Sequence, residues 1–183
     1  IGKSSTTTTY IKGDIRGGID SYTKLLIRSD HPNGSTDIVD SSPSKHSITV
    51  QGGAHHTSSI AKFGNSAIHF DGTGDYLTLA DHADWAFGKG NFTIDFWIYE
   101  ASAIHNKTVI GKTNGVMDFN LNTQTSGGGY YSFAFGANGA SNVTVDSVDA
   151  FSAGWHHLAM VRDVNDLYFF LDGVKKETGD VTG

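Results

Sequence analysis

The sequence predicts an all-β fold, an antiparallel β-sandwich, from three observations. Glycine occupies 23 of the 183 positions, whereas glutamate, a strong helix former, occurs only at Glu100 and Glu177. Short segments rich in β-branched and aromatic residues recur about every ten residues, separated by Gly and Asn turns. Residues 155–176 read as three strands folded back on one another. Together these features favour two packed sheets over any helical fold.

The stretch 155–176 is the clearest part of the pattern. Alternation places Trp155, His157, Ala159 and Val161 on one face, with Leu158 on the other, and we expect both faces to meet protein. Asn and Asp residues at 163–166 suit a tight turn, and residues 172–173 read Asp-Gly, the strongest short hairpin signal. The rest of the chain must then supply the second layer of the sandwich.

The remaining elements follow in chain order. Residues 1–22 show no alternation, so we expect an extended arm or linker before a sandwich domain at 23–183. A short helical turn closed by glycine is expected at 84–88. In the strand at 92–99, Phe92 and Phe96 share a face, and Asp95 and Trp97 share the other. The other expected strands are 24–28, 47–51, 67–70, 75–79, 108–111, 116–121, 130–135 and 143–148.

Composition excludes several classes of function. The net charge of −6 argues against a surface for nucleic acid or anionic membrane. No run of 18 apolar residues and no signal peptide is present, so we expect no membrane span or anchor. The absence of Cys excludes a disulfide framework and thiolate chemistry.

Four passages, in this order, carry a family resemblance. They are Lys24-Leu25-Leu26-Ile27 with Asp40-Ser41-Ser42, Lys62-Phe63-Gly64 leading to 70–77 (FDGTGDYL), 92–97 (FTIDFW), and 155–159 (WHHLA) with Asp172-Gly173. The chain resembles laminin-G-like jelly-roll domains of the concanavalin A-like lectin/glucanase superfamily, of the kind found in bacteriophage structural proteins. The resemblance covers about residues 22–178 and implies the fold. It leaves function open, because lectins, adhesion modules, hydrolases and passive structural domains share this fold.

The carboxyl end departs from the family pattern. Members usually continue past the Asp-Gly hairpin with further strands, whereas this chain stops at Gly183. We therefore expect the last strands to be missing, and the open sheet edge to be completed by another chain or by residues outside this sequence.

Glycoside hydrolysis is not expected. It requires two carboxylates flanking the bond, and the hydrolases of this fold resemble one another in a Glu-x-Asp-x-Glu strand motif. The sequence contains no such motif. The glutamate nearest to Asp95 is Glu100, which has the opposite facing parity and lies beyond the expected strand end.

Metal binding is the next chemical possibility, and calcium suits the sequence better than zinc. Two loops gather oxygen ligands of the kind calcium prefers: one holds Asp71 and Asp75, and the other holds Asp30, Asn33 and Asp37. The alternative is ordinary turn chemistry, in which these side chains accept bonds from local N–H groups. Neither loop matches a complete ligand pattern. The chain has nine histidines, but none lie at a zinc-ligand spacing.

Aromatic side chains are the candidate sugar contacts. Tyr130 and Tyr131 follow a run of glycines and are the residues we select as glycan contacts at a loop rim. The alternative places them in the core, which is also where we expect Trp85 and Trp97.

The favoured function is a non-enzymatic module on the exterior of a phage virion, in a tail, fibre or capsid-decoration role. It would bind host-surface glycan or stabilise the particle, contacting other virion chains through its N-terminal arm and open edge, and it would be oligomeric in the assembly. The alternative is a bacterial secreted or cell-surface adhesin that binds polysaccharide, with calcium as a cofactor.

Overall fold

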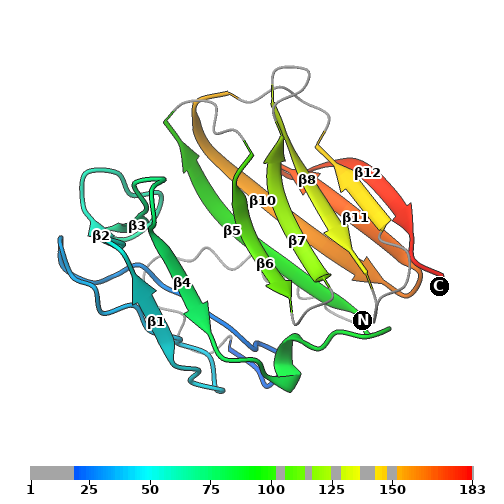
Figure 1. Cartoon of the computed structure of the whole chain (residues 1–183), viewed down its shortest axis with the longest axis horizontal. Coiled ribbons are helices and arrows are strands. Elements are labelled where there is room, and N and C mark those ends of the chain that lie inside the picture. Colours follow the sequence, from blue (N-terminus) through cyan, green and yellow to red (C-terminus); the bar gives the residue numbers. More distant parts are fainter. Residues whose placement is uncertain are drawn as a thin grey trace, which may run out of the picture. The chain divides into compact units, whose positions relative to one another are not determined.

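The computed structural model describes residues 19–101, 106–113, 117–124, 129–136, 143–147 and 152–182, and divides the chain into two compact units, 1–81 and 82–183 (Figure 1). Most of the expected arm, residues 1–18, lies outside the described residues. No helix in the part of the chain described here has the length and apolar character needed to cross a membrane.

The first unit contains two small antiparallel sheets. Strand β1 (Ile48–Gln51) pairs with β4 (Tyr76–Leu79), and β2 (His55–Thr57) pairs with β3 (Ala67–His69). The expected strand at 24–28 does not form, since only a single bridge joins Ile27 to Asp40 there. Two backbone groups of this segment bond to side chains, while Leu26 O accepts a hydrogen bond from Ser41 N–H. Leu26 N–H donates to Asp40, and the Ser42 hydroxyl donates to Lys24 O.

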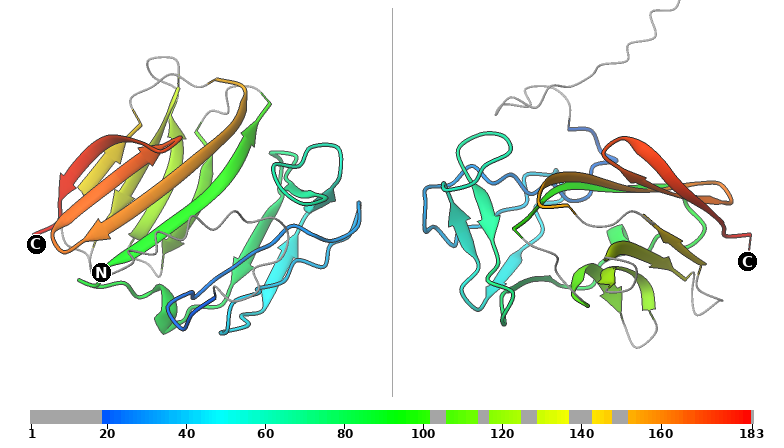
Figure 2. Two further views of the ribbon diagram at one scale, coloured as in Figure 1. Left: turned by 180° about the vertical axis from the view of Figure 1, so that it is seen from behind. Right: turned by 90° about the horizontal axis from the view of Figure 1, so that it is seen from above.

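The second unit is the sandwich, and its two sheets form separate layers in Figure 2. One sheet has the strand order β12-β11-β10-β5 and the other the order β6-β7-β8-β9, with every pairing antiparallel. The strands are β5 (Phe92–Glu100), β6 (Thr108–Thr113), β7 (Met117–Gln124), β8 (Tyr130–Phe135), β9 (Val143–Asp146), β10 (Gly154–Asp163), β11 (Asp166–Leu171) and β12 (Val174–Asp180).

The core lies between these two sheets. Leu158, Met160 and Phe169 from one sheet pack with Leu121 and Phe133 from the other, and all five are fully buried. Their positions follow from the two-residue side-chain period of a strand, which sends every second residue inward. The all-β sandwich expected from the sequence is therefore confirmed.

Two local expectations have different outcomes. The Asp172-Gly173 hairpin is confirmed, with both residues at positive φ (52° and 78°), as the mirror-image turn of a two-residue hairpin requires. The helical turn expected at 84–88 is wrong in its bounds. It is a 3₁₀ helix at Ala83–Trp85 that ends at Ala86, so Gly88, also at positive φ, lies beyond its cap.

Candidate binding face

The outer surface of the β12-β11-β10-β5 sheet carries a concentration of aromatic side chains. Because inward residues such as Phe96 and Leu158 face the core, the alternating residues of the same strands face away from it. The residues that we call the aromatic face are Trp97 and Tyr99 on β5, Trp155 and His157 on β10, and Tyr168 and Phe170 on β11, with Asp95 and Ala159 among them.

Strand register sets the rings of the aromatic face side by side. Trp155 lies opposite Tyr99, with ring centroids 5.5 Å apart and an interplanar angle of 65°, and His157 lies opposite Trp97 at 5.1 Å. Such pairs fix one another's orientation and form a rigid apolar surface. Trp97 and Tyr99 retain 38% and 39% of their surface exposed, so the rings remain accessible.

The placement of Trp97 corrects the expectation that it lies in the core. Trp97 lies two residues after Asp95 in β5, so both side chains project from the same face, while Phe96 and Ile98 pack against the core. The alternation along 92–99 groups Trp97 with Asp95 but does not tell which of the two faces meets the core. In residues 155–162, where we expect both faces to meet protein, Leu158 and Met160 are fully buried, whereas Trp155 and Ala159 on the opposite face are partly buried.

Polar groups lie beside the rings on two sides. On the β5 side, His157 Nε2 lies 3.3 Å from Asp95 Oδ2, and the Asp95 side chain remains 59% exposed. On the β12 side, Lys175 Nζ lies 5.4 Å from the centre of the Tyr168 ring, a cation–π geometry. The face therefore combines flat apolar surfaces with a hydrogen-bonding pair at one margin. This combination can hold a ligand that has apolar faces and polar edges.

Tyr131, one of the two expected glycan contacts, lies in the interior. Its ring is 2% exposed, and its hydroxyl donates a 2.8 Å hydrogen bond to Glu100 Oε1. Burial and the neighbouring carboxyl group raise the pKa of the Tyr131 hydroxyl, so it stays a donor. Tyr130, the next residue along β8, is half-buried and pairs with Gln124 of β7. The structure does not bring the two rings to one surface, because neighbouring strand residues face opposite ways.

The loop residues expected to bind calcium make turn contacts in the structure. Asp75 Oδ2 accepts a 2.9 Å hydrogen bond from Asp71 N–H, and Asp75 Oδ1 accepts one from Gly53 N–H. These two backbone donors lower the pKa of Asp75. Asp71 in turn accepts a hydrogen bond from Thr73 N–H. The carboxylate of Asp75 thus ties the turn at 71–75 to the turn between β1 and β2.

The second expected calcium loop is also occupied by local contacts. Asn33 Oδ1 accepts from Ser58 N–H at 3.0 Å, and Asp37 Oδ2 lies 3.6 Å from His31 Nδ1. Asp30 lies against Gly64, where its Oδ1 fills the space that a Cβ would need. Within the described residues, neither loop brings three acidic or histidine ligand atoms within 4.8 Å of one another.

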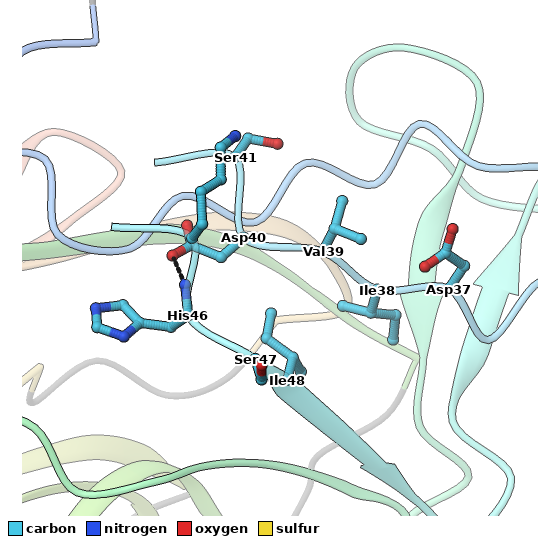
Figure 3. Close-up of a pocket in the computed structure, with 9 residues that line it drawn as sticks. Asp37, Ile38, Val39, Asp40, Ser41, His46, Ser47 and Ile48 are labelled. Atoms are coloured by element: carbon cyan, nitrogen blue, oxygen red, sulfur yellow. Dashed lines mark hydrogen bonds between the residues drawn. The ribbon is translucent and has the colours of Figure 1, made fainter. Parts of the chain in front are cut away.

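A pocket of about 480 Å³ lies in the first unit along residues 37–48 (Figure 3). Its central carboxylate, Asp40, is 5% exposed and accepts hydrogen bonds from Leu26 N–H, Ser42 N–H, the Ser42 hydroxyl and His46 N–H. Burial acts to raise the pKa of Asp40, but the backbone donors and the Ser42 hydroxyl lower it overall. Since these donors already engage both carboxylate oxygens, Asp40 shapes the loop and offers little to a ligand.

Fold and site together define a lectin-like β-sandwich with an aromatic sheet face. Residues 71–183, more than half of the chain, match the Laminin_G_3 family model of the concanavalin A-like lectin/glucanases superfamily. The chain belongs to this family, and the expected jelly-roll fold is confirmed.

A solved structure described as "Crystal structure of HCR/D-Sa-GBL1/C" shares the fold, with a TM-score of 0.61 and 13% sequence identity. The alignment covers 88% of this chain and 41% of that one, so the chain spans about two fifths of that protein's length. At this identity the likeness concerns the fold alone. No curated protein sequence matches the chain.

Proposed function

We propose that this protein is a non-catalytic carbohydrate-binding domain, and that the aromatic face is its binding site. The observation that carries the proposal is the set of paired rings on one sheet surface, with Trp97 and Tyr99 partly exposed. The C–H groups on one face of a pyranose ring pack against aromatic rings, and its hydroxyls bond to groups such as Asp95 at the margin. The superfamily name, lectin/glucanases, is consistent with a sugar ligand.

Binding without cleavage is supported by where the carboxylates lie. Glycosidases place two carboxyl groups about 5–9.5 Å apart around the scissile bond. Asp95 is the carboxylate beside the paired rings. Asp166 accepts a hydrogen bond from the Tyr168 hydroxyl and lies four strand positions further along the sheet, which is about 13 Å by strand rise alone. Glu100 is buried in the sandwich, and Glu177 accepts a hydrogen bond from Asp146 N–H. Both glutamates of the chain are therefore engaged elsewhere.

We place this binding activity on the exterior of a phage virion, in a tail, fibre or capsid-decoration role. The support is the sequence resemblance to phage structural proteins. In that setting the domain would recognise host-surface glycan or stabilise the particle, and the N-terminal arm and a sheet edge would contact other virion chains. A bacterial secreted or surface adhesin would use the same face, and a calcium requirement would favour that alternative.

The test is retention of the protein on a panel of immobilised polysaccharides and glycans, with and without EDTA. We expect the wild-type chain to bind and the Trp97→Ala/Tyr99→Ala variant to lose at least about tenfold in affinity, or about 1.4 kcal/mol. Tyr22→Ala, which removes a ring that is 85% exposed in the first unit, is the matched control and should bind as wild type. An assay of the retained polysaccharide for new reducing ends tests the proposal that the domain binds carbohydrate without cleaving it. Release of such ends, or full binding by the double variant, would contradict the proposal.

A further inference from the structure

One row of the aromatic face runs straight across the sheet and has a small residue at its centre. In strand register, Ala159 of β10 lies opposite Phe170 of β11 on one side and opposite Asp95 of β5 on the other. Phe170 in turn lies opposite Lys175 of β12. The row therefore passes from a cation to a ring, then to a methyl group, and then to a carboxylate.

The side chains around Ala159 are much larger than its methyl group. His157 and Val161 precede and follow it on the same face of β10, and Phe170 stands beside it on β11. Side chains on one sheet face are separated by about 4.8 Å across strands and about 6.8 Å along them, which is close to the width of one sugar ring. Ala159 has the shortest side chain of this group and is only partly buried, so its methyl group can form the floor of a shallow site between the larger side chains.

The polar groups at this position select the chemistry of the ligand. Asp95 stands at the β5 end of the row, and His157 Nε2 lies 3.3 Å from Asp95 Oδ2, so the carboxylate is held at the edge of the space above Ala159. A carboxylate accepts hydrogen bonds from adjacent hydroxyls and repels anionic groups. Lys175 lies over the Tyr168 ring at the far end of the row, away from Asp95. A neutral sugar is the ligand that fits these groups.

We propose that Ala159 is the floor of a subsite that binds one neutral pyranose unit, with Phe170 beside the ring and Asp95 accepting its hydroxyls. The oligosaccharide then crosses the strands along the row from β11 to β5. This inference rests on the proposed carbohydrate-binding function and adds to it a defined subsite, a direction and a ligand class. It also assigns a specificity role to an alanine.

The test fills the subsite and leaves the rings in place. Ala159→Leu adds bulk above the sheet on the side away from the core, so it should fold as wild type. We expect its affinity for the neutral polysaccharide that wild type binds to fall at least about tenfold. Thr49→Leu, which enlarges an exposed strand position in the first unit, is the matched control and should stay within about threefold of wild type. Circular dichroism and thermal unfolding of each variant report whether the fold is retained.

Asp95→Asn is the second variant, and it keeps the shape of the side chain. The amide replaces one acceptor oxygen by a donor, so we expect a loss of about tenfold for neutral sugars. Wild-type binding together with undiminished binding by folded Ala159→Leu and by Asp95→Asn would overturn the subsite but leave the proposed function intact. Wild-type binding to anionic glycans only would overturn the ligand class. Failure of the wild type to bind any glycan would overturn both proposals.

Discussion

Glu100 ends β5 on the inner side of the sandwich, where a carboxyl group has few partners. It is fully buried, its Oε1 accepts the Tyr131 hydroxyl, and its Oε2 has no hydrogen-bond partner among the described residues. Burial raises the pKa of Glu100, and the Tyr131 hydrogen bond and the nearby His156 reduce that rise without cancelling it. The native state therefore holds its proton to a higher pH than the unfolded chain does. Stability consequently falls as the pH rises from the ordinary glutamate value through the raised one.

Replacement of Glu100 tests whether its buried carboxylate lowers the stability of the fold near neutral pH. Glu100→Gln keeps the side-chain shape and the acceptor for Tyr131 but removes the buried charge. We expect the variant to be more stable than wild type by about 1 kcal/mol near neutral pH, with the difference shrinking toward about pH 4. Urea unfolding at several pH values measures this. A variant that is less stable than wild type by the same amount at every pH would show that the buried amide costs more than the charge.

Gly52 is a second residue where local chemistry decides the structure. It follows β1 at φ +69°, and a Cβ there would lie 2.5 Å from both Asp75 Oδ1 and Gly74 O. Any side chain would therefore displace the carboxylate that binds Gly53 N–H and Asp71 N–H. We expect Gly52→Ala to destabilise the first unit by about 2 kcal/mol. Thermal unfolding of this variant is compared with that of Gly34→Ala. Gly34 also has positive φ but nothing within 4 Å, so its variant carries the backbone strain alone. Equal losses in the two variants would contradict the role of the contact.

At the level of elements, the two layers of the sandwich approach each other tightly at a glycine of β12. Gly179 of β12 has an ordinary φ, yet a Cβ there would collide with Val143 Cγ1 and lie 3.0 Å from Val145 Cγ1, both on β9. Gly179→Ala must therefore move β12 away from β9, and we expect a loss of about 1–3 kcal/mol in the free energy of unfolding. The exposed neighbour Thr178→Ala should change it by less than about 1 kcal/mol. A stabilised Gly179→Ala variant would mean that β9 can shift to accept the methyl group.

The elements also show what the sequence could and could not predict. Alternation along 92–99 and 155–162 predicted β5 and β10 and the facing of each residue in them. The segment 24–28 is a short apolar run between two basic residues, which also suggests a strand, but it forms none. The side chains of Asp40 and Ser42 bond there to backbone groups that a neighbouring strand would otherwise pair with. Those partners lie 14 to 18 residues away along the chain, so a local pattern contains no sign of them. The aromatic face was missed for a related reason. Periodicity shows which residues of a strand share a face, but it does not show which of the two faces meets the core.

At the scale of the whole molecule, charge distinguishes the proposed neutral ligand from anionic polymers. The chain carries a net charge of −6, and the proposed subsite presents a carboxylate to its ligand. Binding of a neutral glycan should then depend on ring packing and hydrogen bonds, which salt screens little. Binding of an anionic glycan or nucleic acid would need cations and would weaken steeply with salt.

A salt titration of the intact chain therefore gives the last prediction. Between about 0.05 and about 0.5 M NaCl, the affinity for a neutral polysaccharide should change less than about twofold. Added salt screens interactions between charges, and a neutral ligand forms no ion pair with the protein that could be weakened. The same series with heparin, as a polyanion control, should show no binding that survives the higher salt. Isothermal calorimetry should give a negative heat-capacity change, the signature of apolar surface buried on the rings. An affinity that falls about tenfold or more across this range would assign the interaction to Lys and Arg side chains and remove the aromatic face as its main determinant.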